Sequence, residues 1–306
     1  MNSSRPSLVI SLHTETSDYQ RAEAEAAQVA AQKHGFDVTV FYAEGNALKQ
    51  VDQLIRFVSA PEGSRPSAIM LEPVGTAMVR VAREAVKAGV GWIVLNREVD
   101  YIAELRADAR APVFAVTTNH AQTGRIQGRQ LNTLLPRGGS VVYLQGPAGN
   151  PVVVSRTAGM METKSPQIKL KTLNGHWLDP DAFEAVSSWL RVSSARSPWP
   201  HVVAAQNDQM AMGARRAFDQ FVEKRGDKGQ PQIKYIGCDG LKEHGQKWTS
   251  DGLLTATILC PSLTALAMDV LAKELQQRIS APPMTLSNPV SYPPLEELSA
   301  EAVALA

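Results

Sequence analysis

Short apolar runs rich in β-branched residues alternate with longer segments of helical periodicity along this chain. The first run is 8–12, and an Ala-rich segment, 18–34, follows with its apolar positions on one helical face. Gly35 then stands where a helix C-cap is expected. Such alternation is typical of βαβ units, in which helices join parallel strands. The chain is therefore predicted to belong to the α/β fold class.

The same alternation continues to the end of the chain and divides it into two similar-sized halves, with a break near 117–119. Further strands are predicted at 38–42, 68–71, 92–95, 113–116, 140–144, 168–173, 202–205, 233–237 and 254–259. Further helices are predicted around 51–58, before Gly89, and at 120–135, 181–190, 209–222 and 263–275. The Pro-containing segment 281–294 is predicted to be an irregular return.

The last predicted helix, 263–275, comes after the second half and is compatible with either lobe. We expect discontinuous lobes, because a chain that crosses between lobes more than once forms a hinge of several strands. The N-terminal lobe is predicted to be 7–118 plus 262–288, and the C-terminal lobe 119–261 plus 289–306. The predicted architecture is two Rossmann-like lobes with parallel sheets joined by a multi-strand hinge.

The charge balance disfavours nucleic acid and membrane partners. Lys and Arg number 31 against 30 Asp and Glu, a formal charge of +1 over 306 residues. No apolar run approaches the roughly 20 residues that span a bilayer. The run 8–12 leads straight into His13, Thr14 and Glu15, which does not fit a secretory signal. As written the chain is expected to be cytoplasmic and monomeric; a start placed too far downstream, or a removed leader, would make it periplasmic.

The common metal, nucleotide and hydrolase motifs are absent from the sequence. Its two cysteines, Cys238 and Cys260, lie far apart and form no CxxC, so they are expected to be packed thiols. The six histidines show no HExxH spacing, and no GxxxxGK[ST], GxSxG or GxGxxG occurs. We expect no catalytic residue, metal or cofactor.

Polar and aromatic residues gather directly after the predicted strands. In open parallel sheets ligands bind beyond the carboxyl ends of the strands, so these positions are candidates for a binding site. Hydrogen-bonding side chains beside a flat aromatic face suit a small polyhydroxylated ligand. The candidates are Thr14, Tyr19, Glu72, Asn96, Arg97, Arg156, Trp177, Asn207 and Asp239.

Each candidate also has a structural interpretation. Asn96, Asn207 and Asp239 are suitable helix N-caps, and Trp177 is a suitable core aromatic. The two arginines would be ordinary at the surface. The convergence of several such residues at strand ends favours a binding site.

Three segments of the second half, with Pro261 after them, resemble the ribose/galactose-type sugar-binding proteins of the type I periplasmic solute-binding family, which serve ATP-binding-cassette transporters. They are 205–214 (AQNDQMAMGA), 237–240 (GCDG) and 252–258 (GLLTATI). The segments 71–74, 95–97 and 156–160 and the helix with Gly124 and Gly128 extend the resemblance over nearly the whole chain. The resemblance implies the type I periplasmic binding protein fold, whose two lobes close on a sugar.

The resemblance also implies roles for individual residues. Arg97 and Arg156 match the family's ligand-binding arginines, Trp177 its stacking aromatic, and Asn207 and Asp239 the polar anchors of its second lobe. Tyr19 would pack on the opposite face of the sugar ring.

Three positions depart from the ribose-binding pattern. Asn96 stands for an aspartate, Cys260 for a hinge glutamine, and Glu72 for a smaller polar residue. Cys260 thereby joins the candidate ligand-binding residues. The first loop adds Glu15 and Asp18 with a single aromatic. These differences argue against ribose itself as the ligand. A small polar ligand of another kind is still expected.

The resemblance leads to a non-enzymatic sugar-binding protein that delivers its ligand to the membrane permease of an ATP-binding-cassette transporter. The alternative is a cytoplasmic ligand sensor that passes its closed state to a signalling partner. Direct DNA binding is disfavoured. Regulators of the lactose-repressor type, which share this fold, carry an N-terminal DNA-binding helix-turn-helix, and only seven residues precede the first strand here. An enzyme with Glu72 and Asp239 as an acid–base pair is also disfavoured, since neither residue belongs to a recognisable catalytic constellation.

Overall fold

The computed structural model describes residues 5–193, 199–225 and 232–298, and its chain divides into two compact units. Unit 1 is formed by the chain up to Thr118 together with Pro261–Ser287. Unit 2 is formed by Asn119–Cys260 together with the chain from Asn288 onward. The chain therefore passes between the units three times.

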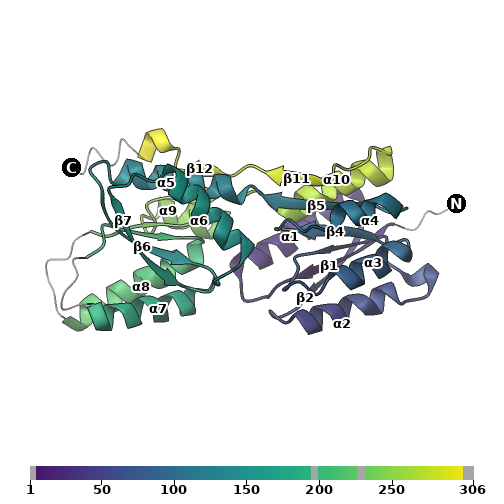
Figure 1. Ribbon diagram of the computed structural model, residues 1–306, viewed down its shortest axis with the longest axis horizontal. Coiled ribbons are helices and arrows are strands. Elements are labelled where there is room, and N and C mark those ends of the chain that lie inside the picture. The colour runs from purple at the N-terminus through teal and green to yellow at the C-terminus, as the bar shows by residue number, and fades with distance from the viewer. Residues whose placement is uncertain (1–4, 194–198, 226–231, 299–306) are drawn as a thin grey trace. The chain divides into compact units, whose positions relative to one another are not determined.

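Unit 1 is built on a six-stranded parallel sheet with helices on both faces (Figure 1). Its strand order is β11-β5-β4-β3-β1-β2. The strands are β1 (Ser7–Leu12), β2 (Asp37–Tyr42), β3 (Ala68–Leu71), β4 (Gly91–Leu95), β5 (Val113–Thr118) and β11 (Met284–Ser287). The helices are α1 (Asp18–His34), α2 (Ala47–Val58), α3 (Val79–Lys87), α4 (Ile102–Asp108) and α10 (Leu263–Gln277), with a 3₁₀ turn at Glu62–Ser64.

Alternate residues of the strands in unit 1 point to two separate cores, as the period of a strand requires. Leu8 and Ile10 of β1 pack under α1 and α10 on one face. Val9, between them, packs under α2, α3 and α4 on the other. Because both faces are covered, the strands are continuous apolar runs, and this is why the sequence reveals them. Helix α1 ends at Gly35, whose φ of 71° confirms the predicted left-handed C-cap.

Unit 2 is built on a four-stranded parallel sheet of order β7-β6-β8-β9, beside which β10 and β12 pair antiparallel. The strands are β6 (Gly139–Gln145), β7 (Ile168–Asn174), β8 (Val202–Ala205), β9 (Lys234–Ile236), β10 (Thr257–Leu259) and β12 (Val290–Tyr292). The helices are α5 (His120–Leu134), α6 (Pro151–Thr163), α7 (Asp179–Ser193), α8 (Asp208–Arg225) and α9 (Lys247–Ser250), with a π-helical turn at Lys242–Gln246.

Three glycines bring α5 and α6 into close contact. A Cβ atom on Gly124 would lie 1.9 Å from the carbonyl oxygen of Arg156, and one on Gly159 would lie 2.0 Å from that of Ala121. A Cβ on Gly128 would meet the Thr163 side chain and the Met160 carbonyl. The backbones can approach this closely only because these positions lack side chains. The contact fixes the position of the α6 turn that contains Arg156.

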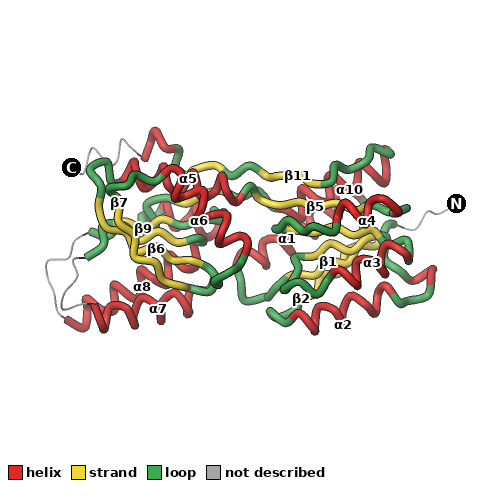
Figure 2. Tube along the Cα trace, viewed as in Figure 1, coloured by secondary structure: helices red, strands yellow, loops and turns green. Residues whose placement is uncertain are grey.

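Two elements lie within a segment that the sequence predicted to be irregular. Residues 281–294 contain β11 (Figure 2), which pairs with β5, and β12, which pairs with β10. Both strands are short, and Met284, Leu286 and Val290 are exposed, so they lack the apolar pattern of the buried strands. The stretch 97–110, for which the sequence predicts no element, contains α4. Among the described helices none has the length and apolarity to cross a membrane.

Candidate functional site

The carboxyl ends of β3 and β4 bring two candidate residues of unit 1 together. Glu72 follows β3 and Asn96 follows β4, and these strands are neighbours in the sheet. Asn96 Nδ2 donates to Glu72 Oε1 at 3.0 Å, and Gln20 Nε2 of α1 donates to Glu72 Oε2 at 2.5 Å. Two neutral amides thus orient a half-buried carboxylate. Its remaining lone pairs can accept hydrogen bonds from ligand hydroxyls.

Two glutamines that the sequence analysis missed hold this strand-end region in place. Gln50, fully buried on α2, donates to Ser11 Oγ and to the Glu72 carbonyl, both at 2.9 Å. Its Oε1 accepts from Val74 N at 2.8 Å. Gln20 also accepts from His13 N at 2.7 Å. A polar residue on the buried face of an amphipathic helix was the available signal, since such groups are buried only with partners.

Of the other three candidates of unit 1, Thr14 and Arg97 lie in the surrounding loops and Tyr19 lies in helix α1. Thr14 Oγ1 lies 3.0 Å from Thr16 Oγ1 and 3.5 Å from a carboxylate oxygen of Glu44. Tyr19 is half-buried in the first turn of α1. Arg97 donates to the Gly75 carbonyl at 3.1 Å. These contacts anchor the loops.

In unit 2, Arg156 of α6 lies at the centre of the candidate residues. The residue is buried, with 6% of its surface exposed. Its Nη1 donates to the Gln206 carbonyl, and its Nε to His120 Nδ1 at 3.4 Å. Its Nη2 lies 3.8 Å from Asp239 Oδ1, and the guanidinium lies 5.8 Å from the centre of the Trp177 ring. The structure thus brings together three residues predicted separately, and they combine a cation, an anion and an aromatic face.

Trp177 is seated over a glycine at the end of β6. A Cβ atom on Gly146 would lie 2.2 Å from Cε2 and Cζ2 of the indole, so only glycine leaves room for the ring. Asn207 Nδ2 donates to the Trp177 carbonyl at 2.8 Å and fixes its backbone.

Replacing Gly146 with alanine is expected to displace the indole and weaken the binding of any ligand that stacks on it. Overpacking of this kind costs about 1–3 kcal/mol, which corresponds to a loss of affinity of about 5- to 150-fold if it falls on the bound state. Isothermal titration of the variant measures the effect. Gly149→Asn serves as the control, because the Gly149 site has open space and asparagine tolerates its φ of 76°. Unchanged affinity in Gly146→Ala would remove Trp177 from the site.

Asn207 has the capping role that the sequence allowed. Its Oδ1 accepts from Met210 N at 2.9 Å in the first turn of α8. With its Nδ2 bonded to Trp177, the residue joins this helix to the loop after β7.

Asp208 lies beneath the site as a fully enclosed carboxyl. It accepts from the Thr257 hydroxyl at 2.6 Å and from Gly240 N at 2.8 Å. Burial, with the neighbouring Asp239 carboxylate second, holds the pKa of Asp208 well above its usual value. Its contacts fix the turn that follows Asp239.

Three candidate residues adopt left-handed backbone conformations that side chains usually avoid. The φ angles are 61° at Asn96, 74° at Trp177 and 98° at Asp239. Such conformations cost of order 1–3 kcal/mol each and collect at functional sites. All three residues follow parallel strands, so the strain coincides with the predicted ligand-binding edge.

Cys260, the remaining candidate, lies beside the other cysteine. The Sγ atoms of Cys238 and Cys260 are 3.7 Å apart, and both thiols are free. A hydrogen bond from Cys238 lowers the pKa of Cys260, whereas burial raises that of Cys238 well above its usual value. Cys238 is buried as expected, and Cys260 is half-buried.

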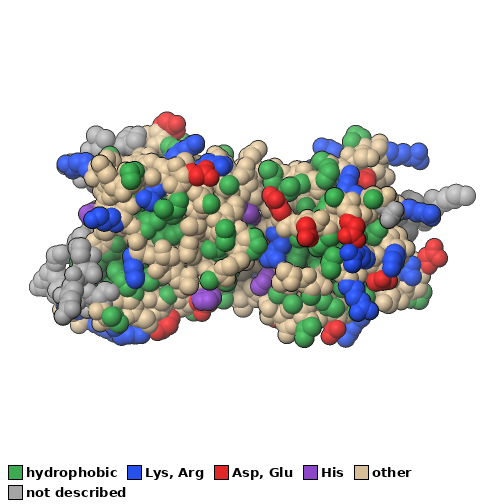
Figure 3. Space-filling view, viewed as in Figure 1, with side chains coloured by type: hydrophobic (Ala, Val, Ile, Leu, Met, Phe, Trp, Pro, Cys, Tyr) green, Lys and Arg blue, Asp and Glu red, His purple; other side chains and the backbone are tan. Residues whose placement is uncertain are grey.

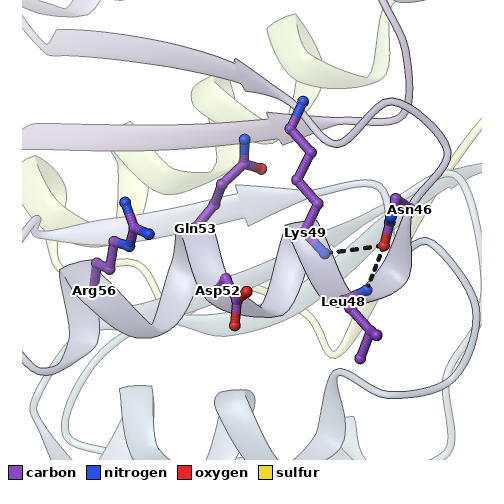
Figure 4. A pocket seen from close by; sticks show the side chains of 6 residues that line it. All are labelled: Asn46, Leu48, Lys49, Asp52, Gln53 and Arg56. Atoms are coloured by element: carbon purple, nitrogen blue, oxygen red, sulfur yellow. Dashed lines mark hydrogen bonds between the residues drawn. The ribbon is translucent and has the colours of Figure 1, made fainter.

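A groove of about 450 Å³ runs along α2 in unit 1 but contains none of the candidate residues (Figure 4). Asn46, Lys49 and Arg56 are among its lining residues, and most of these are exposed. Asn46 accepts from Leu48 N and Lys49 N and so caps the helix. Asn46 thus has a structural role in the helix.

Acidic and basic side chains are interspersed over α3 and α4 on the face of unit 1 seen in Figure 3. Arg83 pairs with Glu104 at 2.9 Å and Lys87 with Glu84 at 3.2 Å. This mixture agrees with the near-zero formal charge and does not favour a polyanion.

Comparison with known proteins identifies similar chains. A family model described as "periplasmic binding protein domain" matches residues 8–278. The ribose import binding protein RbsB of Escherichia coli strain K12 is 26% identical over 239 residues, which are 76% of this chain and 72% of that protein. A fructose import binding protein, FruE of Bifidobacterium longum strain NCC 2705, is 26% identical over 73% of this chain and 65% of its own length.

Solved structures confirm the predicted fold. A galactofuranose-binding protein superposes with a TM-score of 0.79 at 23% identity, covering 98% of this chain and 99% of its own. A myo-inositol-binding protein of Caulobacter gives a TM-score of 0.78 at 20% identity, covering 98% and 96%. The two-lobed α/β fold with parallel sheets is therefore shared.

Proposed function

We infer that this chain, which belongs to the periplasmic binding protein domain family, is a non-enzymatic binding protein for a small sugar or sugar-like polyol in an ATP-binding-cassette uptake system. The observation that carries this proposal is the arrangement of Arg156 between Asp239 and the Trp177 ring at the strand ends of unit 2. The relatives named above are import binding proteins, which supports binding over catalysis.

The chemistry of the candidate residues suits a sugar. The indole face of Trp177 can pack on the apolar C–H face of a pyranose or furanose ring. Arg156 supplies N–H donors, and the carboxylates of Asp239 and Glu72 supply acceptors for neighbouring hydroxyls. Hydrogen bonds to charged groups are the strong ones, so these three residues would provide most of the polar affinity.

We propose that residues of both units contact the ligand and that ligand binding favours a closed form. The three passages of the chain between the units would act as the hinge. The location that fits this role is the periplasm, in place of the cytoplasmic location expected from the sequence as written. The membrane permease of the transporter would then be the partner.

Thermal unfolding with a panel of sugars tests the proposal. The full chain, refolded free of ligand, is heated with pentoses, hexoses, deoxysugars, furanose sugars and cyclitols. A sugar at 100 times its Kd adds about 2.7 kcal/mol to the free energy of unfolding and raises the Tm. A shift for one sugar is expected, lost in Trp177→Ala and retained in Trp189→Phe. Trp189 of α7 serves as the control because it packs against Phe218 in a core cluster of unit 2. No shift with any member of the panel would contradict sugar binding.

A further inference from the structure

The fold brings together three potential metal ligands that are far apart in the sequence. Cys238 and Asp239 follow β9, and Cys260 follows β10. The two sulfur atoms are 3.7 Å apart, and these atoms and a carboxylate oxygen of Asp239 all lie within 4.8 Å of one another. All three residues belong to unit 2. No sequence motif predicts this cluster of three residues, because its members come from two segments that meet only in the folded protein.

The strand register at this point disfavours a disulfide. Isolated parallel bridges place Ile236 opposite Ala256 and Asp239 opposite Leu259. Cys238 and Cys260 are therefore diagonal, two positions apart along neighbouring strands. Regular strand spacing puts such Cα atoms about 8 Å apart, beyond the roughly 7 Å that a disulfide can bridge.

The distance between the two sulfur atoms suits two thiolates bound to one metal ion. Two Zn–S bonds of about 2.3 Å at a tetrahedral angle hold their sulfur atoms about 3.8 Å apart. The thiols of Cys238 and Cys260 already have this spacing at 3.7 Å. The Asp239 carboxylate is a third ligand of a kind that zinc accepts.

We propose that Cys238, Cys260 and Asp239 bind a thiophilic divalent cation, Zn²⁺ being the natural example. Three protein ligands leave a fourth position for water or a ligand hydroxyl, as in zinc sites that are not purely structural. Metal binding goes beyond the proposed sugar binding and does not depend on it.

Arg156 balances the charge of this site. Two thiolates and one carboxylate carry three negative charges, which the cation and the nearby guanidinium together neutralise. The guanidinium lies 3.8 Å from Asp239 Oδ1 and is itself buried. An uncompensated set of buried thiolates would be costly, whereas this set is neutral once the ion is bound.

Titration with Co²⁺ tests the proposal without any sugar. The reduced, chelator-treated full chain is expected to take up one ion, with the visible bands of tetrahedral cobalt and a thiolate-to-cobalt charge-transfer band. Zn²⁺ should then displace the cobalt. Cys238→Ser and Cys260→Ser should each weaken cobalt binding by more than about 100-fold. Loss of a residue that only hydrogen-bonds a metal ligand already weakens metal affinity by up to about 100-fold, and loss of a ligand itself should cost more. Glu162→Gln, which removes an exposed carboxylate paired with Arg125, should leave binding unchanged.

Far-ultraviolet circular dichroism and Tm establish that each variant is folded. A cobalt complex without charge-transfer absorption, or one that persists in the double serine variant, would overturn the proposal. So would failure of the reduced wild-type chain to take up cobalt. The titration contains no sugar, so its failure would contradict the metal site alone. Failure of the sugar panel would contradict the proposed function alone.

Discussion

Replacing Arg156 with alanine is expected to lower ligand affinity at least about 10-fold, because one charge-assisted hydrogen-bonding partner is lost. The variant should also lose about 3 kcal/mol of folding stability, the lower end for removing one member of a buried ion pair. The guanidinium joins the Gln206 carbonyl, His120 Nδ1 and Asp239, and alanine leaves all three without it. Calorimetric titration below the Tm of the variant, with denaturant unfolding, separates the two effects.

Arg125→Ala is the matched control for this variant. Arg125 is on α5 and pairs with Glu162 at 2.6 Å, where the two side chains are 35% and 52% exposed. Surface pairs of this kind contribute about 0–1 kcal/mol, so affinity and stability should change little. Wild-type affinity in the folded Arg156→Ala variant would show that Arg156 does not contact the ligand.

Replacing Gly124 with alanine is expected to destabilise the protein by about 2 kcal/mol. The new methyl would lie 1.9 Å from the Arg156 carbonyl oxygen and 2.7 Å from Met160 N, so α6 must move as a whole. Overpacking costs up to about 3 kcal/mol, and alanine recovers up to about 1 kcal/mol through its helix propensity. Because the displaced turn contains Arg156, ligand affinity should fall as well. Denaturant unfolding and calorimetry measure both changes.

Gly63→Ala is the control for the backbone contact. Gly63 lies in the exposed 3₁₀ turn of unit 1, and apart from its own atoms and those of its two chain neighbours nothing lies within 4 Å of the position its Cβ would take. Its substitution should change stability by less than about 0.5 kcal/mol, as at other surface positions. A Gly124→Ala variant as stable as Gly63→Ala would mean that α5 and α6 separate without cost.

The elements that could be predicted from sequence are those whose burial gives them a periodic pattern. Strand β3 is apolar at every position, since both of its faces are covered. Helix α6 is absent from the elements predicted by periodicity, because Val152, Val153 and Val154 have the composition of a strand. Its capping signal was nevertheless present: Asn150 accepts from Val152 N at 2.9 Å, and Pro151 follows at the first helical position. Strand β11 is stabilised by its pairing with β5, and the residues of β11 themselves carry no pattern that predicts this pairing.

The candidate site divides in the same way. Glu72, Asn96 and Asp239 could be proposed because they directly follow strands. Gln20, the partner of Glu72, and His120, the partner of Arg156, come from helices. Nothing local to those helices shows which site residue each one faces. The proximity of Cys238 to Cys260 likewise depends on which two strands are neighbours.

The closing of unit 1 by α10 and β11 has a consequence for synthesis on the ribosome. Glu23 of α1 is fully enclosed, and its carboxylate accepts from Leu263 N, from Thr264 N and from the hydroxyls of Ser262 and Thr264. These donors are translated some 240 residues after Glu23. Until they emerge, the nascent N-terminal lobe has an open apolar face on α1 and an edge strand, β5, without its neighbour. At about 5–20 residues per second this interval lasts at least about ten seconds, and the growing chain needs protection from aggregation throughout it.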